Sequence, residues 1–394
     1  GTKKTTESLF IGGILSYLII AIFNGGNFIT MITDSFFKVV TDYDNQWMII
    51  LTGLFGSLIA LLSASNATYA IAKFLGKFCK TERSTLIATW ILGVVIFIDD
   101  TLNIMAVGTC MKSLADKNKV PRESLAYVVD STTAPACVVF PFSTWVIFYA
   151  GVFWEQEAVK SLGYASAMQT YYHIIPFVFY GMIALILVPL FAFGILPKFG
   201  AMKKAYQRTT STDSVFSKAS EKLNEVMNTS DNIEVEHSSL GDFVVPIVVL
   251  IALTFIIDDM LIAVIASIFV CLIMFTIERR ITLNEFCKLW IKGFADMIPA
   301  LAILVAALFM RNACADIMLP DYIINAVGPF ISAKLFPLMT FIIVAGLAFV
   351  TGSCWGVPGV CTPILIPLAV ACNANLILVM AAIVSGGTFG SHAC

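Results

Sequence analysis

Two adjacent carboxylates, Asp99 and Asp100, lie inside the apolar run that extends from Thr89 to Asn103. A bilayer makes ionisable side chains costly, so those that occur at membrane depth usually face a wet cavity and bind cations or protons. Asn103 lies one helical turn further on, where it would either offer an amide oxygen to an ion or cap a helix. The pair therefore predicts ion or proton transport within a membrane, with one carboxylate binding the ion and the other capping a helix.

A second polar group follows in another apolar stretch and consists of Asp130, Ser131, Thr132 and Thr133. Pro135 comes directly after it and predicts a break in the helix, because proline lacks the backbone donor and disfavours helix at the preceding residue. The hydroxyl oxygens suit a hard cation such as Na+, or they satisfy the backbone of their own helix. Asp130 is a candidate proton carrier, because neighbouring carboxylates in one small cavity cannot all ionise cheaply; a helix cap is the alternative. The predicted Na+ ligands are Asp99, Asp100 and Asp130.

The second half of the chain carries the candidate substrate pocket, which comprises Thr351, Ser353, Trp355, Ser385, Thr388 and His392. The run Ser385-Gly-Gly-Thr388 predicts a second helix break, at which unwound backbone would free carbonyls for a cation. Trp355 would line or gate the pocket, or pack between the repeated halves of the chain. His392 would titrate near neutral pH or remain solvated. Asp258 and Asp259 fit an ordinary loop between two short spans.

Composition sets the broad class, since 59% of the residues are hydrophobic and only 13% are charged. Such a balance is typical of a polytopic membrane protein and excludes a nucleic-acid-binding one. The ten cysteines lie mostly in apolar stretches and are expected to be buried free thiols. The three histidines are scattered and the chain has no phosphate-binding loop, so the sequence predicts that the protein is not an enzyme and not an ATP-driven pump. No cofactor is expected beyond Na+ and H+ as coupling ions.

The basic residues predict the topology. Eight stretches are apolar enough to cross a bilayer: 8–28, 46–64, 124–150, 171–195, 242–257, 260–277, 294–312 and 376–394. Residues 84–111 have basic clusters at both ends, so a simple crossing would conflict with the positive-inside rule. A re-entrant hairpin that enters from the cytoplasm and turns at the Asp99-Asp100 pair removes the conflict. The cytoplasmic segments then hold 20 of the 24 basic residues, and the polar linker 198–241 is cytoplasmic.

The order of these features predicts two inverted-topology repeats. The first, 1–197, contains the hairpin 84–111 and the broken helix 124–150, and the linker 198–241 follows it. The second, 242–394, contains a hairpin at 335–372 and a broken helix at 376–394 that is expected to be cut short. The predicted fold is thus an all-α polytopic membrane protein in which each repeat carries a re-entrant helical hairpin and a broken transmembrane helix.

Five segments together resemble the NhaC-type Na+/H+ antiporter family: Phe97–Asn103, Val107–Thr109, Arg122–Pro135, Thr351–Gly356 and Ser385–His392. The resemblance implies an ion-transporter architecture and coupling to sodium or protons. It leaves the solute open, because similar proteins include sodium–proton antiporters, malate–lactate antiporters and amino-acid transporters. Family members usually have an aromatic residue where this chain has Thr101, which implies a less bulky pocket. They also continue past His392 with an Asp-containing stretch, so a further acidic site residue is expected beyond Cys394.

These features predict a secondary active transporter that resembles the Na+/H+ antiporters and exchanges sodium, protons or both by alternating access. The alternative is an organic-solute antiporter coupled to Na+ or H+, for malate and lactate or for amino acids. An ion channel is less favoured, because the chain lacks repeated filter segments. The expected location is the cell (inner) membrane, with several passes. The expected partners are a small ion or solute and the lipid bilayer but no nucleic acid, and a homodimer is a candidate assembly.

Overall fold

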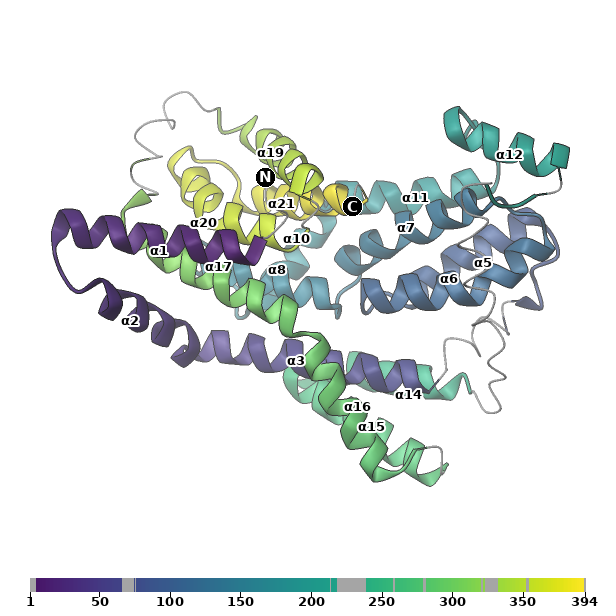
Figure 1. Ribbon diagram of the computed structural model, residues 1–394, viewed down its shortest axis with the longest axis horizontal. Helices are drawn as coiled ribbons and strands as arrows, with labels where there is room; N and C mark the ends of the chain where they lie inside the picture. Colours follow the sequence, from purple (N-terminus) through teal and green to yellow (C-terminus); the bar gives the residue numbers. More distant parts are fainter. Residues whose placement is uncertain are drawn as a thin grey trace. The chain divides into compact units, whose positions relative to one another are not determined.

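The computed structural model describes residues 5–65, 74, 76–212, 214–217, 239–257, 259–278, 281–319, 322, 332–351 and 354–392. Over these residues the chain is helical and has no strand, which confirms the all-α fold class (Figure 1). The helices are α1 (Thr5–Asn24), α2 (Phe28–Thr41), α3 (Tyr43–Ala64), α5 (Glu82–Val95), α6 (Asp100–Lys117), α7 (Arg122–Val139), α8 (Thr144–Trp154), α9 (Glu157–Lys160), α10 (Ala167–Ile174), η1 (Ile175–Phe177), α11 (Phe179–Ala192), α12 (Gly200–Thr212), α14 (Gly241–Ile257), α15 (Met260–Ile277), α16 (Leu283–Asp296), α17 (Ile298–Asp316), α19 (Phe336–Thr351), α20 (Gly356–Ala371) and α21 (Leu376–Ser391).

Several of these helices can cross a membrane. Four described segments are long and apolar enough, namely Thr6–Asn24, Tyr43–Ala64, Met260–Ile277 and Leu283–Asp316. Two bent pairs of helices can each form one further span: α7 with α8, and Ala167–Phe177 with Phe179–Ala192. The protein is therefore a multi-pass membrane protein, as the composition predicts.

The chain divides into two compact units that each draw on distant parts of the sequence. Unit 1 consists of Gly1–Gly56, Val138–Met182 and Phe294–Cys394, and unit 2 of Ser57–Cys137 and Ile183–Gly293. Each unit takes segments from both of the predicted repeats. The division into repeats at 198–241 concerns internal symmetry and stays a prediction.

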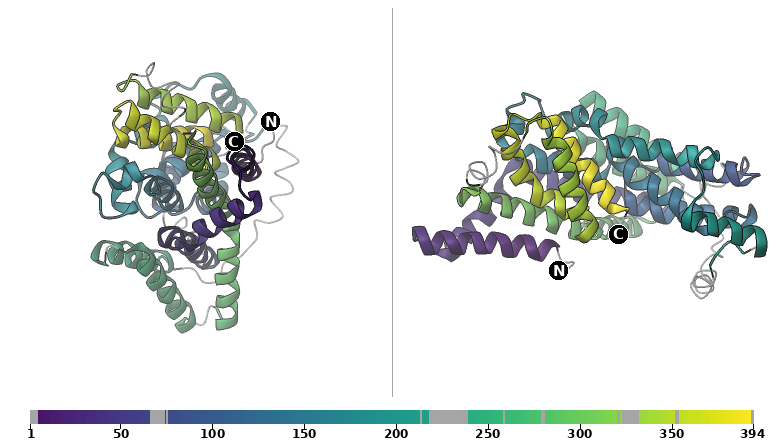
Figure 2. Two further views of the ribbon diagram at one scale, coloured as in Figure 1. Left: turned by 90° about the vertical axis from the view of Figure 1, so that its left-hand side faces the viewer. Right: turned by 90° about the horizontal axis from the view of Figure 1, so that it is seen from above.

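In unit 1, small residues allow helices to pack closely. Helices α19 and α21 lie side by side (Figure 2). A Cβ atom at Gly386 would lie 2.9 Å from Val344 Cβ and 3.0 Å from the backbone nitrogen of Ala345, and one at Gly390 would lie 2.9 Å from Ala348 Cα. Glycines four residues apart on one helix face are a common way to bring two membrane helices into contact. These glycines therefore serve packing, and α21 runs unbroken through 385–387, so the break predicted there is wrong.

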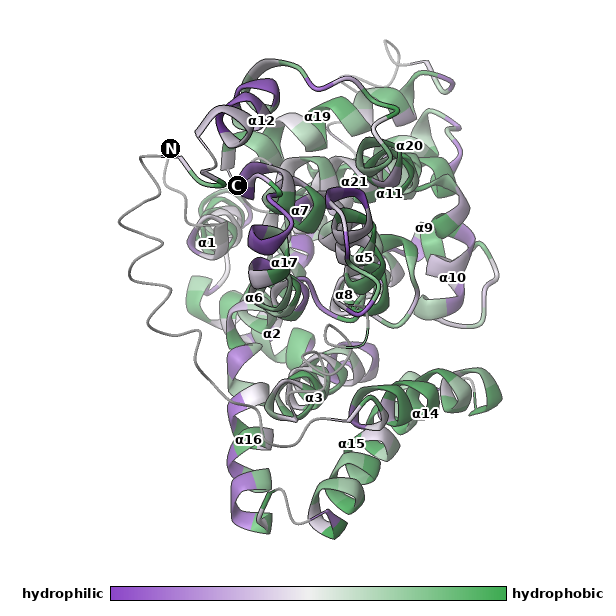
Figure 3. Ribbon diagram, turned by 90° about the vertical axis from the view of Figure 1, so that its right-hand side faces the viewer, coloured by the Kyte–Doolittle hydropathy of each residue, from purple (hydrophilic) through white to green (hydrophobic). Residues whose placement is uncertain are grey.

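In unit 2, two helical hairpins dominate: α5 with α6, and α14 with α15. Figure 3 shows that α14 and α15 are largely apolar along their length. A hydrogen bond of 3.0 Å from Ser267 Oγ to the carbonyl oxygen of Pro246 connects these two helices inside their apolar contact. The interior of unit 2 therefore pairs its few polar groups locally, as a low-dielectric environment requires.

The break in the first broken span lies later than the sequence predicts. Helix α7 is continuous through Pro135 and ends at Val139, and α8 begins at Thr144. Proline removes only one helical hydrogen bond, which membrane helices tolerate. The chain instead breaks after Pro141, where Phe142 takes a φ of +73° and Ser143 caps α8 through a 3.0 Å hydrogen bond from the Val146 amide. The predicted break beside Asp130 is therefore wrong.

Candidate functional site

The connection between α5 and α6 forms the tip of the predicted first hairpin. Helix α5 ends at Val95, the backbone leaves helical geometry, and α6 begins at Asp100. Asp99 is the N-cap of α6: its Oδ1 accepts a 2.9 Å hydrogen bond from the Leu102 amide, and the residue is only 4% exposed. Asp100 occupies the first turn of α6 and is half-buried. Of the two adjacent carboxylates, Asp99 is thus the one that caps a helix. The sequence alone does not distinguish it from Asp100 in this role.

Asn103 holds the two arms of this hairpin together. Its Nδ2 donates to the carbonyl oxygens of Gly93, at 2.6 Å, and of Ile96, at 2.9 Å. These carbonyls belong to the last turn of α5, which has no partner within its own helix. Asn103 is completely buried. Of the two roles that the sequence allows, the hydrogen bonds support helix capping.

Two threonines of α7 complete a buried polar cluster around Asn103. Thr133 Oγ1 lies 3.2 Å from Asn103 Oδ1 and 2.7 Å from the Val129 carbonyl oxygen, and Thr132 Oγ1 donates to the Val128 carbonyl at 2.6 Å. Both threonines are at most 1% exposed. A Cβ atom at Gly93 would lie 3.0 Å from the Thr132 methyl group, so the missing side chain lets α5, α6 and α7 meet here. Unit 2 therefore contains one desolvated group of amide and hydroxyl oxygens.

The other residues predicted on α7 lie on different sides of the helix. Asp130 is exposed and Ser131 is half-buried, whereas Thr132 and Thr133 are buried. Successive helical residues point about 100° apart, so one helix face cannot present all four. The four predicted ligands of this segment are therefore split between a buried and a more accessible side of α7.

In unit 1, Trp355 packs against the aromatic side chains of α8. Its ring centroid lies 5.5 Å from that of Trp145 and 4.8 Å from that of Phe148. Tyr149 Oη donates a 3.4 Å hydrogen bond to the carbonyl oxygen of Cys354. Trp355 itself is half-buried. These contacts pack Trp355 against α8, and its role in lining or gating a pocket stays a prediction.

The remaining residues of the predicted pocket also belong to unit 1. Ser385 and Thr388 are buried in α21, and Thr388 Oγ1 donates to the Val384 carbonyl at 2.8 Å. His392 Nδ1 lies 2.7 Å from Tyr180 Oη and the imidazole is half-buried, so it is not simply solvated. Thr351 ends α19 and donates to the Leu347 carbonyl at 2.8 Å. Ser353 and Asp258 lie outside the described residues.

A buried ion pair in unit 1 is absent from the sequence predictions. Arg311 of α17 donates to the carboxylate of Glu155, whose side chain is 4% exposed, to the Glu155 carbonyl oxygen at 2.8 Å, and to Asn312 Oδ1 at 2.9 Å. Burial raises the pKa of the Glu155 carboxyl above its ordinary value, although the adjacent Arg311 opposes this shift. Arg311 is the only basic residue in the predicted span 294–312, which was the signal available in the sequence.

Two further carboxylates approach Glu155 at the α2–α3 junction. One oxygen from each of Asp42, Asp44 and Glu155 lies within 4.8 Å of the other two. Lys160 Nζ lies 3.3 Å from Asp44 Oδ2, and Arg311 pairs with Glu155. The two basic side chains already neutralise two of the three acids, so the group is an ion-pair network of unit 1.

Comparison with known proteins places the chain in a family. Residues 136–394, well over half of the chain, match the sequence profile of the Na+/H+ antiporter family. The chain belongs to the Na+/H+ antiporter family. The family-level resemblance is thus confirmed, and assignment to the NhaC type stays a prediction. The matched region begins within α7, after the α5–α6 hairpin.

Two similar proteins extend the comparison over nearly the whole chain. An uncharacterized protein of Haemophilus influenzae (strain ATCC 51907 / DSM 11121 / KW20 / Rd) is 25% identical over 427 residues, which cover 99% of this chain and 79% of that protein. The structure of Neisseria gonorrhoeae MtrF, described as illuminating a class of antimetabolite efflux pumps, matches with a TM-score of 0.60 and 15% identity. That match covers 95% of this chain and 73% of MtrF and shows a shared fold. The family makes this chain a secondary membrane transporter.

Proposed function

We propose that this transporter exchanges Na+ for protons, with the exchanged ions binding at the tip of the α5–α6 hairpin. The observation that supports this most is the break between α5 and α6, which brings Asp99 and Asp100 next to the buried cluster of Asn103, Thr132 and Thr133. A desolvated group of oxygen atoms beside carboxylates has the chemistry that a hard cation requires.

We assign different tasks to the carboxylates. Asp99 holds the start of α6 through its cap, so its conformation is fixed by the helix. Asp100 is half-buried in the first turn and is the residue we assign to the exchanged ion. A negative side chain at this position also interacts favourably with the helix N-terminus, which stabilises the empty site. Asp130, on the accessible side of α7, is the second proton carrier in this proposal.

Exchange then follows from competition for the same carboxylate. A carboxylate that holds a proton has lost the charge that binds Na+, and a bound Na+ disfavours protonation of that carboxylate. One gradient drives the other ion uphill when the site opens alternately to the two sides of the membrane. The Thr132 hydroxyl donates its proton to the Val128 carbonyl, and the Thr133 hydroxyl shares its proton between the Val129 carbonyl and Asn103 Oδ1, so both oxygens keep lone pairs for a cation.

Flux measurements test this assignment. The purified protein is reconstituted into proteoliposomes, and ²²Na+ uptake is measured under an imposed pH gradient for the wild type, Asp100→Asn, Asp130→Asn and Asp34→Asn. Asp34 is an exposed residue of α2 and serves as the matched control. We expect Asp100→Asn to abolish proton-driven uptake, because the amide keeps the volume and removes the charge. Uptake that persists in Asp100→Asn at the level of Asp34→Asn would remove Asp100 from the mechanism.

The pH dependence tests the proton carrier separately. In the wild type we expect the apparent Na+ affinity to increase with pH, since fewer protons compete for the carboxylates. Asp130→Asn should weaken this dependence without abolishing it, because Asp100 still exchanges Na+ for a proton, and Asp34→Asn should retain it in full. An unchanged dependence in Asp130→Asn would exclude Asp130 and leave Asp100 as the proton carrier.

An organic-solute antiporter coupled to Na+ or H+ is the second candidate. The observation that favours it is the aromatic contact of Trp355 with Trp145 and Phe148, which provides flat apolar surface next to a polar backbone turn. The same proteoliposomes are therefore loaded with malate, lactate or an amino acid. Solute-dependent Na+ flux that falls in Trp355→Ala would favour this candidate over simple ion exchange.

A further inference from the structure

Helix α12 follows a candidate membrane span along the chain. It follows the apolar helix α11 after the short connection 193–199, and α11 with the preceding helix forms one of the bent candidate spans. Three apolar side chains of the connection are strongly exposed: Phe193 at 53%, Ile195 at 66% and Phe199 at 76%. Exposed aromatic and aliphatic residues at the end of a span are typical of the boundary between lipid tails and headgroups.

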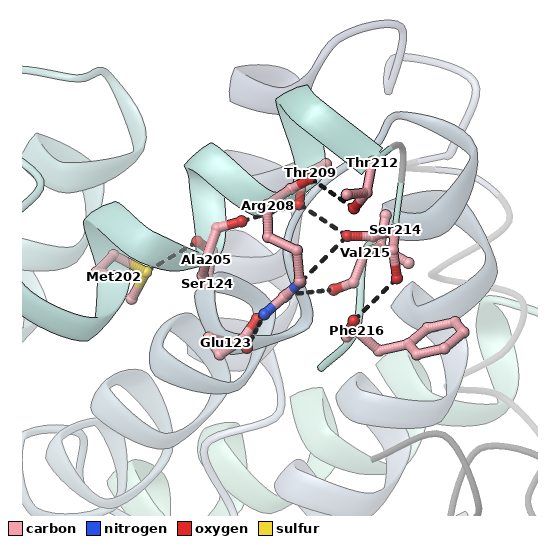
Figure 4. Close-up of polar contacts among 10 residues, drawn as sticks. All are labelled: Glu123, Ser124, Met202, Ala205, Arg208, Thr209, Thr212, Ser214, Val215 and Phe216. Atoms are coloured by element: carbon pink, nitrogen blue, oxygen red, sulfur yellow. Dashed lines mark hydrogen bonds and ion pairs between the residues drawn. The ribbon is translucent and has the colours of Figure 1, made fainter. Parts of the chain in front are cut away.

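The buried side of α12 is fixed to the start of α7. Arg208 makes a bidentate ion pair with Glu123, with Nη1 and Nη2 at 2.9 and 2.8 Å from the two carboxylate oxygens, and also donates to the Ser214 and Val215 carbonyls (Figure 4). This carboxylate raises the pKa of the Arg208 guanidinium. Ser124 Oγ contacts Met202 Sδ at 3.1 Å. These contacts leave the opposite side of the helix exposed in a defined orientation.

One lysine next to α12 is already neutralised. Lys198 Nζ lies 3.1 Å from Glu82 Oε1 and 3.1 Å from the centroid of the Tyr206 ring. Burial and the nearby Glu82 carboxylate raise the pKa of the Tyr206 phenol, so it stays protonated at physiological pH. These two contacts hold the Lys198 side chain against α12.

Lys203 and Lys204 are exposed residues of α12. Among the residues that the structure describes, no acidic side chain forms an ion pair with either lysine. Figure 3 shows α12 as a largely hydrophilic helix. Its exposed side therefore attracts an anion.

An open cavity of about 580 Å³ lies on this exposed side. It is lined by Lys198, Lys203, Tyr206, Gln207, Thr210 and Ser211. The Lys203 ammonium and the Gln207 amide are the donors that this lining offers to an anion, because the Thr210 and Ser211 hydroxyls donate their protons to the Tyr206 and Arg208 carbonyls. The lining therefore combines positive charge with neutral polar groups, which suits a phosphate ester.

We propose that this cavity binds the headgroup of an anionic phospholipid from the membrane surface at which α11 ends. Lys203 neutralises the phosphate, and the exposed Phe193, Ile195 and Phe199 contact the acyl chains next to it. A free phosphate would gain nothing from those apolar side chains, so we commit to a lipid. The site is independent of the exchanged ion and requires only that the chain is a membrane protein.

Native mass spectrometry of the full-length chain in detergent tests the proposal. Phosphatidylglycerol or phosphatidylcholine is titrated into the wild type, the double variant Lys203→Gln/Lys204→Gln, and the control Lys288→Gln/Lys292→Gln. The control removes the same charge from two exposed positions of α16. A lysine near an anionic headgroup contributes roughly a fivefold gain in affinity, and of this pair only Lys203 lines the cavity, so we expect the first double variant to bind phosphatidylglycerol about fivefold more weakly. The control should bind it like the wild type.

Three results would overturn the lipid site. The first is equal binding of phosphatidylglycerol and phosphatidylcholine by the wild type. The second is an equal loss in the α16 control, which would indicate general electrostatic attraction. The third is displacement of phosphatidylglycerol by inorganic phosphate at a matching concentration, which would show that the phosphate group alone is bound. Because binding is read without any flux, failure of this proposal leaves the ion-exchange proposal untouched.

Discussion

Replacing Asn103 by alanine should loosen the α5–α6 hairpin, because this side chain makes all the cross-hairpin hydrogen bonds described above. Alanine removes the donors to the Gly93 and Ile96 carbonyls and the acceptor for Thr133 Oγ1. Hydrogen bonds inside membrane proteins contribute about 0.6 kcal/mol each on average, so three of them predict a loss of about 2 kcal/mol. The loss should appear in the free energy of unfolding, measured by titration with sodium dodecyl sulfate and followed by far-UV circular dichroism.

Asn45→Ala is the matched control. Asn45 is 2% exposed, and its side-chain amide donates one hydrogen bond of 2.9 Å, to the Val39 carbonyl. The same reasoning predicts a loss of about 0.6 kcal/mol for this variant. A double-mutant cycle of Asn103→Ala with Thr133→Val should show a coupling energy of about 0.6 kcal/mol. If Asn103→Ala loses no more stability than Asn45→Ala, Asn103 does not hold the hairpin and the reasoning fails.

Three further predictions concern unit 1. Burial raises the pKa of the Glu155 carboxyl above its ordinary 4.5, so the folded state binds this proton more tightly than the unfolded chain does. The free energy of unfolding should therefore fall as the pH rises from about 4.5 through the raised pKa. Glu155→Gln should remove this decline. Arg311→Met leaves the buried carboxylate without its cation and should cost about 3 kcal/mol in the same unfolding titration, whereas a loss below about 1 kcal/mol would contradict a buried ion pair. Gly390→Ala should cost about 1–3 kcal/mol because the new methyl group meets the Ala348 backbone, while Gly346→Ala, with open space around its Cβ position, should be neutral or stabilising; equal effects would refute the close α19–α21 contact.

The sequence could not predict where the helices break. Pro135 follows the polar run from Asp130 to Thr133 and has the local chemistry of a break, but α7 continues through it. The break occurs after Pro141, because Phe142 adopts a left-handed backbone and Ser143 caps the next helix. Similarly, the glycines of α21 permit both unwinding and close packing, and the adjacent α19 selects packing. A local residue pattern permits several structures, and the neighbouring helices decide among them.

The sequence by itself determined that this protein works in a lipid bilayer and where along the chain most of its helices lie. Apolar length and a low content of charge require membrane helices in any arrangement, since a bilayer leaves no other way to pair the backbone. Only the tertiary structure decided which polar side chains serve the fold: Asp99 caps α6, Asn103 ties the hairpin, and Trp355 packs on α8. The reason is that a hydrogen bond or a ring contact forms only where folding brings two groups within reach of each other in the right orientation. The residue type determines what a side chain can bind, and the packing of the helices determines which groups lie within its reach.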